Sequence, residues 1–265
     1  MKKWCASVLL CAALLLGPSA QAAGSVLVDG APLENNASAQ VRNNTTYVSL
    51  RTVAQALRPT ATVVWENGQA TVRDSTLSLT ARPGSIYIAA NDRAIYLPDG
   101  VLLEDGCTLV PVRALASALG AQVEWDADTG TVYITSGAAA FAAYDSNSLY
   151  WLSRIISAES QGESLLGKIA VGNVVLNRVA SAEFPDSIYG VIFDDRWGGQ
   201  FEPVRNGSIY QEPTEESVLA AKLVLEGASV AGNSLYFLSP SLTSNHWIMN
   251  NRPYVMTIGC HWFYA

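Results

Sequence analysis

An internal repeat in the first half of the chain limits the fold more than any other feature. Residues 47–57 (YVSLRTVAQAL) return as residues 109–119 (LVPVRALASAL). The copies continue in step, since residues 63–72 (VVWENGQATV) match residues 123–132 (VEWDADTGTV). Two such units, about 60 residues apart, predict a pair of pseudo-symmetric α/β halves.

Each unit predicts the same three elements. The apolar residues before Arg51 and before Arg113 are typical of a short strand, and the Ala/Leu-rich stretch after each predicts one helix of about eight residues. A β-hairpin around Trp65 or Trp125, with turn-forming residues behind it, completes each unit. We interpret both arginines as structural residues that bond to carbonyls or acids within their own unit.

The second copy reads VPVRALASALGAQVEW over residues 110–125. This pattern resembles the stalk domain at the N-terminus of copper amine oxidases, which is also appended to many exported bacterial hydrolases. The resemblance implies a spacer or wall-anchoring module over residues 24–136. Copper sites usually draw on His or sulfur ligands, and this region has no His and one Cys, so we expect no copper there.

The N-terminus predicts export. Lys2 and Lys3 precede an apolar run over residues 8–16, and an A-x-A cleavage pattern follows at residues 20–22. We therefore expect residues 1–22 to be a signal peptide and the protein to be secreted, either to the cell wall or to another extracytoplasmic location. The run is far shorter than the roughly 20 residues of a membrane helix, and no later segment is apolar enough to span. A net charge of −7 without a basic cluster argues against nucleic-acid or anionic-membrane partners.

The cysteines do not form a disulfide framework. Cys5 and Cys11 lie in the predicted signal, which leaves Cys107 and Cys260, one in each half of the chain. A bridge between the halves and two buried unpaired thiols are both open.

Small residues over 137–145 predict a linker, and residues 146–265 are enough for a second core. The expected fold class is α+β: a pseudo-duplicated α/β stalk followed by a domain with helices and a small sheet.

A carboxylate ends the first predicted helix of the second domain. Apolar side chains fall at positions 149, 152, 155 and 156, the spacing of a helix with one buried stripe, and Glu159 continues that stripe. A partly desolvated carboxyl has a raised pKa, which suits a general acid. Spacing alone also fits an ordinary residue at a helix end, hydrogen-bonded to the backbone of the next helix.

Six motifs follow one another through this domain. They are AESQGE (158–163), GKIAVGNVVLNRV (167–179), FPDSIYGVI (184–192), QFEPV (200–204), LYFLSP (235–240) and IGCHWF (258–263). Together they resemble the SleB/CwlJ-like cell-wall hydrolases of the spore-cortex lytic enzyme family, from about residue 148 to residue 265. The resemblance implies a lysozyme-like, lytic transglycosylase-type fold, Glu159 as catalytic acid/base, and peptidoglycan glycan strands as substrate, cut at the MurNAc–GlcNAc β-1,4 bond.

A single carboxylate suffices if the muramic C6 hydroxyl attacks the anomeric carbon, which forms a 1,6-anhydro sugar, whereas a conventional glycosidase needs two carboxyl groups. The second candidate is Glu163, which we interpret as a residue that orients the site or caps the following helix. We expect Arg178 to brace a carboxylate, and Asp194 and Asp195 to be loop residues.

Further candidates for binding substrate are one amide and three aromatic residues. Gln200 can hydrogen-bond to an N-acetyl group, and Phe201, Tyr236 and Trp262 can stack on sugar faces, although core packing is the alternative for all three.

No metal or cofactor is expected, because His246 and His261 lack Cys or acid partners at ligand spacing. The alternatives to a lytic transglycosylase are a muramidase, an amidase, or a non-catalytic wall-binding module. The wall-binding repeats that often precede this domain are replaced by the stalk, which offers a contact to the wall or to a partner protein. Spore cortex and vegetative wall are both open as targets.

Overall fold

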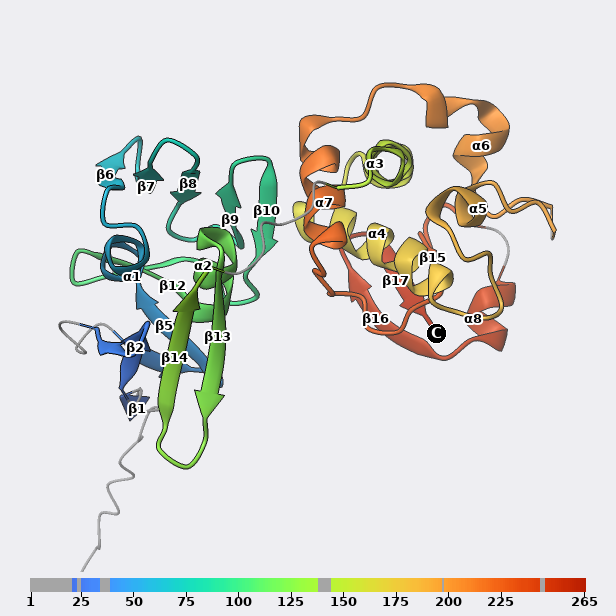
Figure 1. The fold of residues 1–265 in the computed structure, drawn as a ribbon. Helices are drawn as coiled ribbons and strands as arrows, with labels where there is room; N and C mark the ends of the chain where they lie inside the picture. The colour runs from blue at the N-terminus through green and yellow to red at the C-terminus, as the bar shows by residue number, and fades with distance from the viewer. Residues whose placement is uncertain (1–20, 23–24, 34–38, 138–143, 197, 244–245) are drawn as a thin grey trace, which may run out of the picture.

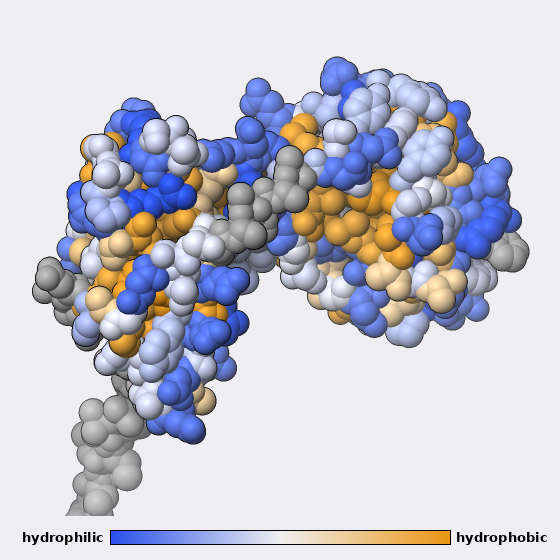
Figure 2. Space-filling model, viewed as in Figure 1, coloured by the Kyte–Doolittle hydropathy of each residue, from blue (hydrophilic) through white to orange (hydrophobic). Residues whose placement is uncertain are grey.

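The computed structural model describes residues 21–22, 25–33, 39–137, 144–196, 198–243 and 246–265, which form two lobes (Figure 1). Most of the predicted signal peptide and most of the predicted linker lie outside the described residues. Figure 2 shows hydrophilic residues over much of the surface in this view and apolar patches on both lobes. Within the described residues, none of the helices combines the length and hydrophobicity that crossing a bilayer requires.

The two copies of the repeat meet in the central sheet of the first lobe. The sheet is antiparallel, and its order is β1 (Gln21–Ala22), β4 (Gln40–Arg42), β5 (Thr45–Ser49), β12 (Cys107–Pro111) and β11 (Leu102–Glu104). Strands β5 and β12 are the matching strands of the two copies, and Val48 of one copy pairs with its counterpart Val110 of the other. The repeat is therefore built around a local two-fold relation.

Each copy also contributes a hairpin around its tryptophan. The first, β6 (Thr62–Glu66) with β7 (Gln69–Arg73), extends through β8 (Ser78–Ala81), β9 (Tyr87–Ala90) and β10 (Arg93–Tyr96). The second, β13 (Ala121–Asp126) with β14 (Thr131–Ser136), adds β2 (Val26–Val28) in parallel and then β3 (Ala31–Pro32). Both predicted hairpins are present.

The two matching helices have the predicted length of eight residues: α1 (Leu50–Leu57) and α2 (Val112–Leu119). The Ser49 side chain caps α1 by accepting from the backbone N–H of Thr52, whereas Pro111 precedes α2 without a side-chain cap. Their apolar faces complete one core with the sheets.

Three helices build the second lobe: α3 (Ser146–Ser160), α4 (Leu165–Val179) and α7 (Glu215–Leu225). The predicted stripe of α3 is real, since Leu152, Ile155 and Ile156 are fully buried.

Shorter elements complete the second lobe around these three helices. They are α5 (Ile188–Ile192), α6 (Glu202–Asn206), α8 (Trp247–Asn251) and the 3-10 turn η2 (Ser208–Tyr210). A small antiparallel sheet has the order β15 (Tyr236–Leu238), β17 (His261–Tyr264), β16 (Tyr254–Ile258). The predicted α+β class is confirmed.

The two lobes touch through β10 and α7. Arg93 of β10 forms a bidentate ion pair with Glu226, at 2.7 and 2.8 Å, and the hydroxyl of Tyr144 donates to the same carboxylate at 3.0 Å. Ala94 is buried against the core of the second lobe.

Cys107 and Cys260 are both free and exposed, so the structure has two unpaired thiols at its surface.

Candidate active site

Glu159 lies in the last turn of α3, directly beyond the buried apolar stripe of that helix. It is partly buried, and none of the described residues donates a hydrogen bond to its carboxylate. Burial raises the pKa of Glu159 to about 7, while the positive charge of Arg178 lowers it and the negative charge of Glu202 raises it further. Desolvation dominates because no donor compensates the charged form. Glu159 is therefore a carboxyl that can both give and take a proton near neutral pH.

Arg178 lies in the last turn of α4, and its positive charge lowers the pKa of Glu159. Its side chain is almost completely buried, with the residue only 4% exposed, and burial lowers its pKa to about 10. Its Nε donates to the carbonyl of Leu235 at 2.7 Å, but its Nη1 has no hydrogen-bond partner among the described residues. A buried, unpaired guanidinium nitrogen has unused capacity to stabilise a negative charge beside it.

Three aromatic rings enclose the Arg178 guanidinium. The ring centres of Phe184, Phe201 and Tyr236 lie 4.9, 5.1 and 5.6 Å from its Cζ atom. Such rings attract a cation and exclude water from it. Four separate parts of the second domain thus converge on the charge that lowers the pKa of Glu159.

Close packing of α3 against α4 fixes the positions of Glu159 and Arg178 relative to each other. Gly172 of α4 leaves no room for a larger side chain, because a Cβ there would come within 2.9 Å of both Ile156 of α3 and Val224 of α7. The start of α4 is fixed by Ser164, whose side chain accepts from the backbone N–H of Gly167. The last turns of both helices therefore occupy fixed positions in one core.

Glu163 has a different environment from Glu159. Its carboxylate accepts hydrogen bonds from the backbone N–H of Cys260, at 3.1 and 3.3 Å, and lies 3.8 Å from Nδ1 of His261. Gly259 adopts a left-handed conformation (φ 57°), and any Cβ there would overlap the Glu163 carboxylate. Glu163 fastens the loop between α3 and α4 to the β16–β17 hairpin, and Ser164 rather than Glu163 caps α4.

The remaining predicted site residues divide between two places. Tyr236 and Phe201 lie at Arg178, although Phe201 is only 3% exposed and packs in the core. Gln200 precedes Phe201 and is partly buried. Trp262 is on the hairpin, where it packs edge-on against Tyr254 with ring centres 6.3 Å apart. The structure thus brings Tyr236 and Phe201 together at Arg178, and it places Trp262 against Tyr254 on the hairpin that Glu163 contacts.

The sequence places Glu202 with Gln200 and Phe201 on a loop suited to lining a groove, without a chemical role for Glu202 itself. It opens α6 and forms an exposed ion pair with Arg205, yet its charge acts on Glu159. Its place beside Gln200 in the QFEPV motif was the available signal. Asp194, in contrast, is a structural acid: hydrogen bonds from Arg196 hold its pKa below the usual range. Among the described residues, no group of three or more His, Cys, Asp or Glu side chains is placed to hold a metal ion.

Two family matches cover most of the described chain. Residues 162–264 match the family described as Cell Wall Hydrolase, and residues 27–134 match the family described as Copper amine oxidase N-terminal domain. The first lobe is therefore similar to the copper amine oxidase N-terminal domain, and the second lobe to the cell wall hydrolase family. The match to this family begins at Gly162, just after Glu159.

Individual proteins are similar to the second lobe. A spore cortex-lytic enzyme of Bacillus cereus is 38% identical over 120 residues, which is 45% of this chain and 45% of that protein. The cell wall hydrolase CwlJ of Oceanobacillus iheyensis is 33% identical over 95 residues, 34% of this chain and 66% of that protein. This chain thus spans less than half the length of the spore cortex-lytic enzyme it matches.

A solved structure is also similar in sequence: the catalytic domain of the germination-specific lytic transglycosylase SleB from Bacillus anthracis. It is 36% identical, and the alignment covers 48% of this chain and 100% of that one, with a TM-score of 0.43.

Proposed function

We propose that this protein is an exported peptidoglycan-degrading enzyme that cleaves the MurNAc–GlcNAc β-1,4 bond as a lytic transglycosylase, with Glu159 as its acid/base. The observation that carries the proposal is the Glu159 carboxyl, whose pKa burial raises to about 7 and which receives no hydrogen bond from the described residues. The match of residues 162–264 to the cell wall hydrolase family and the names of the similar proteins support the substrate.

The reaction needs one group that first gives a proton and then takes one. Glu159 protonates the oxygen between the two sugars while the C1–O bond breaks, so the electron pair of that bond leaves with the oxygen. The C6 hydroxyl of the same muramic unit bonds to C1, and its proton passes to Glu159, which restores the acid. The product is a 1,6-anhydro sugar, and no water is consumed.

Arg178 acts on the charge that appears during this cycle. Glu159 is neutral before the proton transfer and negative after it, and the buried guanidinium favours the negative form. A fixed cation in a water-excluded site stabilises developing charge without reorganising. Arg178 is thus a positioning residue in the proposal: it acts through Glu159 rather than on the sugar.

Hydrolysis by a muramidase route is the second candidate function, and Glu202 is the observation that favours it. Its charge reaches Glu159, and two carboxyl groups at one site are the requirement of a conventional glycosidase. An amidase has no comparable support among the described residues.

The remaining parts of the proposal concern organisation. The division is a signal peptide over residues 1–22, a stalk over 24–136, a linker over 137–145 and the hydrolase domain over 146–265. The protein acts outside the cytoplasm, and its stalk contacts the wall or a partner protein. Buried contacts between the lobes, above all the Arg93–Glu226 ion pair, support a stalk held firmly against the hydrolase domain.

Mass spectrometry of digested peptidoglycan distinguishes the two reactions. The wild-type protein is expected to release muropeptides that end in 1,6-anhydro-MurNAc, and the E202Q variant is expected to give the same product. Reducing ends in the wild-type digest that disappear with E202Q would establish hydrolysis instead. Spore cortex and vegetative sacculi, digested side by side, would show which wall is cut.

A further inference from the structure

The two copies of the stalk repeat use their matching arginines differently. In the first copy, Nη1 of Arg51 donates to the carbonyl oxygen of Val63 at 3.0 Å. The second copy has Arg113 and Val123 at the equivalent positions, yet the exposed Arg113 side chain forms no hydrogen bond or ion pair with any residue in the described part of the chain. The prediction of an internal bond is thus confirmed for Arg51 and wrong for Arg113.

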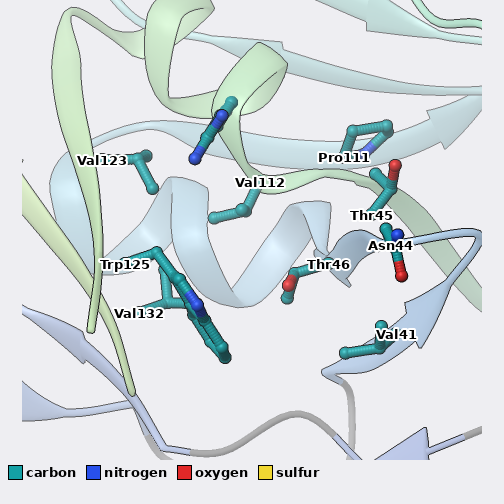
Figure 3. A pocket seen from close by; sticks show the side chains of 10 residues that line it. Val41, Asn44, Thr45, Thr46, Pro111, Val112, Val123, Trp125 and Val132 are labelled. Carbon is teal, nitrogen blue, oxygen red and sulfur yellow. The ribbon is translucent and has the colours of Figure 1, made fainter. Parts of the chain in front are cut away.

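Arg113 borders a cavity of about 380 Å³ in the stalk. Figure 3 shows this cavity from close by, with most of its lining residues labelled. The cavity lies between the β4–β5 hairpin, the start of α2 and the β13–β14 hairpin, and its volume falls in the range of about 300–1,000 Å³ that is usual for small-molecule sites. Its lining consists of Val41, Asn44, Thr45, Thr46, Pro111, Val112, Arg113, Val123, Trp125 and Val132.

The lining combines three kinds of group that suit one class of ligand. The indole of Trp125, a residue 45% exposed, lies with Val132 on one side of the cavity, across from Val41 and Thr46 (Figure 3). Asn44, Thr45 and Thr46 of the β4–β5 hairpin supply amide and hydroxyl groups that can exchange hydrogen bonds with a polar ligand. The lining has one cation and no acid, in a chain of net charge −7. A ligand with a flat or apolar part and a negative group is complementary to this arrangement.

We propose that this cavity binds a carboxylate-bearing unit of peptidoglycan, with Trp125 against its apolar face and Arg113 paired with its carboxylate. The inference rests on the proposed function, because that function makes peptidoglycan the polymer beside the stalk. Guanidinium and carboxylate groups form strong bidentate hydrogen bonds, and aromatic rings pack well against the apolar faces of partly polar ligands. The stalk would then hold the enzyme on its substrate.

Binding of the full chain to insoluble peptidoglycan tests the proposal. The E159Q background prevents digestion during the measurement, and R113Q and W125A are compared on that background. Trp65 is the matched control, because it occupies the equivalent position in the first copy, is 51% exposed, and does not line the cavity. We expect R113Q and W125A each to weaken binding about tenfold. The difference between R113Q and the parent should disappear at high salt, because salt screens the charge of Arg113. W65A should bind as the parent does.

Two parts of the polymer can carry a free carboxylate, the lactyl group of a muramic unit that lacks a stem peptide and the stem peptide itself, and competition distinguishes them. Displacement by free N-acetylmuramic acid would assign the site to the lactyl carboxylate, whereas displacement by a short peptide ending in D-alanine would assign it to the stem peptide. Either result supports the proposal. Unchanged binding by R113Q, or an equal loss in W65A and W125A with unchanged melting temperatures, would overturn it.

Failure of the enzymatic proposal would be visible separately. A chain with intact Glu159 that releases no fragments from peptidoglycan would contradict the proposed reaction, whatever the E159Q variant binds. Normal digestion by the wild-type chain together with parental binding by R113Q would contradict the stalk site alone.

Discussion

Glu159 and Glu163 are four residues apart in the chain, but their surroundings are opposite. Glu163 accepts hydrogen bonds from the backbone of Cys260 and lies beside His261, so it joins two loops. Glu159 is partly buried at the end of an apolar stripe with no donor among the described residues, and its pKa is raised to about 7. Both residues are partly buried, so the difference between the two carboxylates lies in their hydrogen-bond donors. The absence of hydrogen-bond donors leaves Glu159 free to exchange a proton.

The largest expected effect separates the two glutamates directly. E159Q removes the proton donor and should lower the rate of peptidoglycan cleavage about 10³-fold, since general acid/base groups contribute roughly 10²–10⁴-fold. E163Q is the matched control, because its amide oxygen can still accept from the Cys260 N–H, and it should retain most of the activity. Release of soluble muropeptides measures both. Equal losses in the two variants would remove the distinction.

A smaller effect is expected from the buried cation. R178Q should lower kcat by on the order of tenfold to a hundredfold, because the Glu159 anion loses its stabilising charge. Arg178 lowers the pKa of Glu159, so its removal raises that pKa. Activity requires the protonated acid, and the fall of activity at high pH should therefore move to higher pH.

R178K is the control for that variant, because it keeps the charge and should keep the high-pH limb near its original position. A purely structural role for Arg178 would lower activity in both variants without moving the limb.

The environment of Glu159 should also cost stability at high pH. Its pKa in the folded protein, about 7, lies above the ordinary value of 4.5, so the folded state binds this proton more tightly than the unfolded state does. The resulting stabilisation is fully present below pH 4.5 and is lost as the pH rises through 7. E159Q should therefore exceed the wild type in unfolding free energy by on the order of 2 kcal/mol at pH 8 and match it at pH 4. Denaturant melts at both pH values measure the difference, and an E159Q protein that is less stable at pH 8 would contradict it.

The smallest expected effect comes from Glu202. Its charge raises the pKa of Glu159, so E202Q should move the high-pH limb of the activity profile slightly to lower pH. The displacement is small because Glu202 is exposed and paired with Arg205, and water and salt screen such charges. Added salt should shrink it further. A limb that moves upward would show that Glu202 acts in another way.

Local features of the fold were readable from the sequence because they depend on neighbours in the chain. The repeat predicted both eight-residue helices and both tryptophan hairpins, and the apolar spacing predicted the buried stripe that leads to Glu159. The backbone N–H that donates to Glu163 belongs to Cys260, 97 residues further along the chain. It lies in a turn that requires glycine at position 259, because a Cβ there would overlap the Glu163 carboxylate. No local pattern predicts such a contact.

The arginines show the same limit. Arg51 and Arg113 occupy matching motifs, and the sequence therefore assigned them one role. Only the packing of each unit reveals that one of them bonds to a carbonyl while the other borders a cavity. Likewise, the proximity of Arg178 to Glu159 depends on how closely α4 packs on α3 at Gly172, which helical spacing does not specify.

Titration of the Glu159 carboxyl tests the central claim most directly. Carboxyl chemical shifts of protein labelled with ¹³C-glutamate, assigned by comparison with E159Q, would follow this group from pH 3 to pH 9. A midpoint near pH 7 that moves upward in R178Q is the result expected of a buried acid without hydrogen-bond donors. A midpoint near the ordinary value of 4.5 would contradict the assignment of Glu159 as the proton donor at neutral pH.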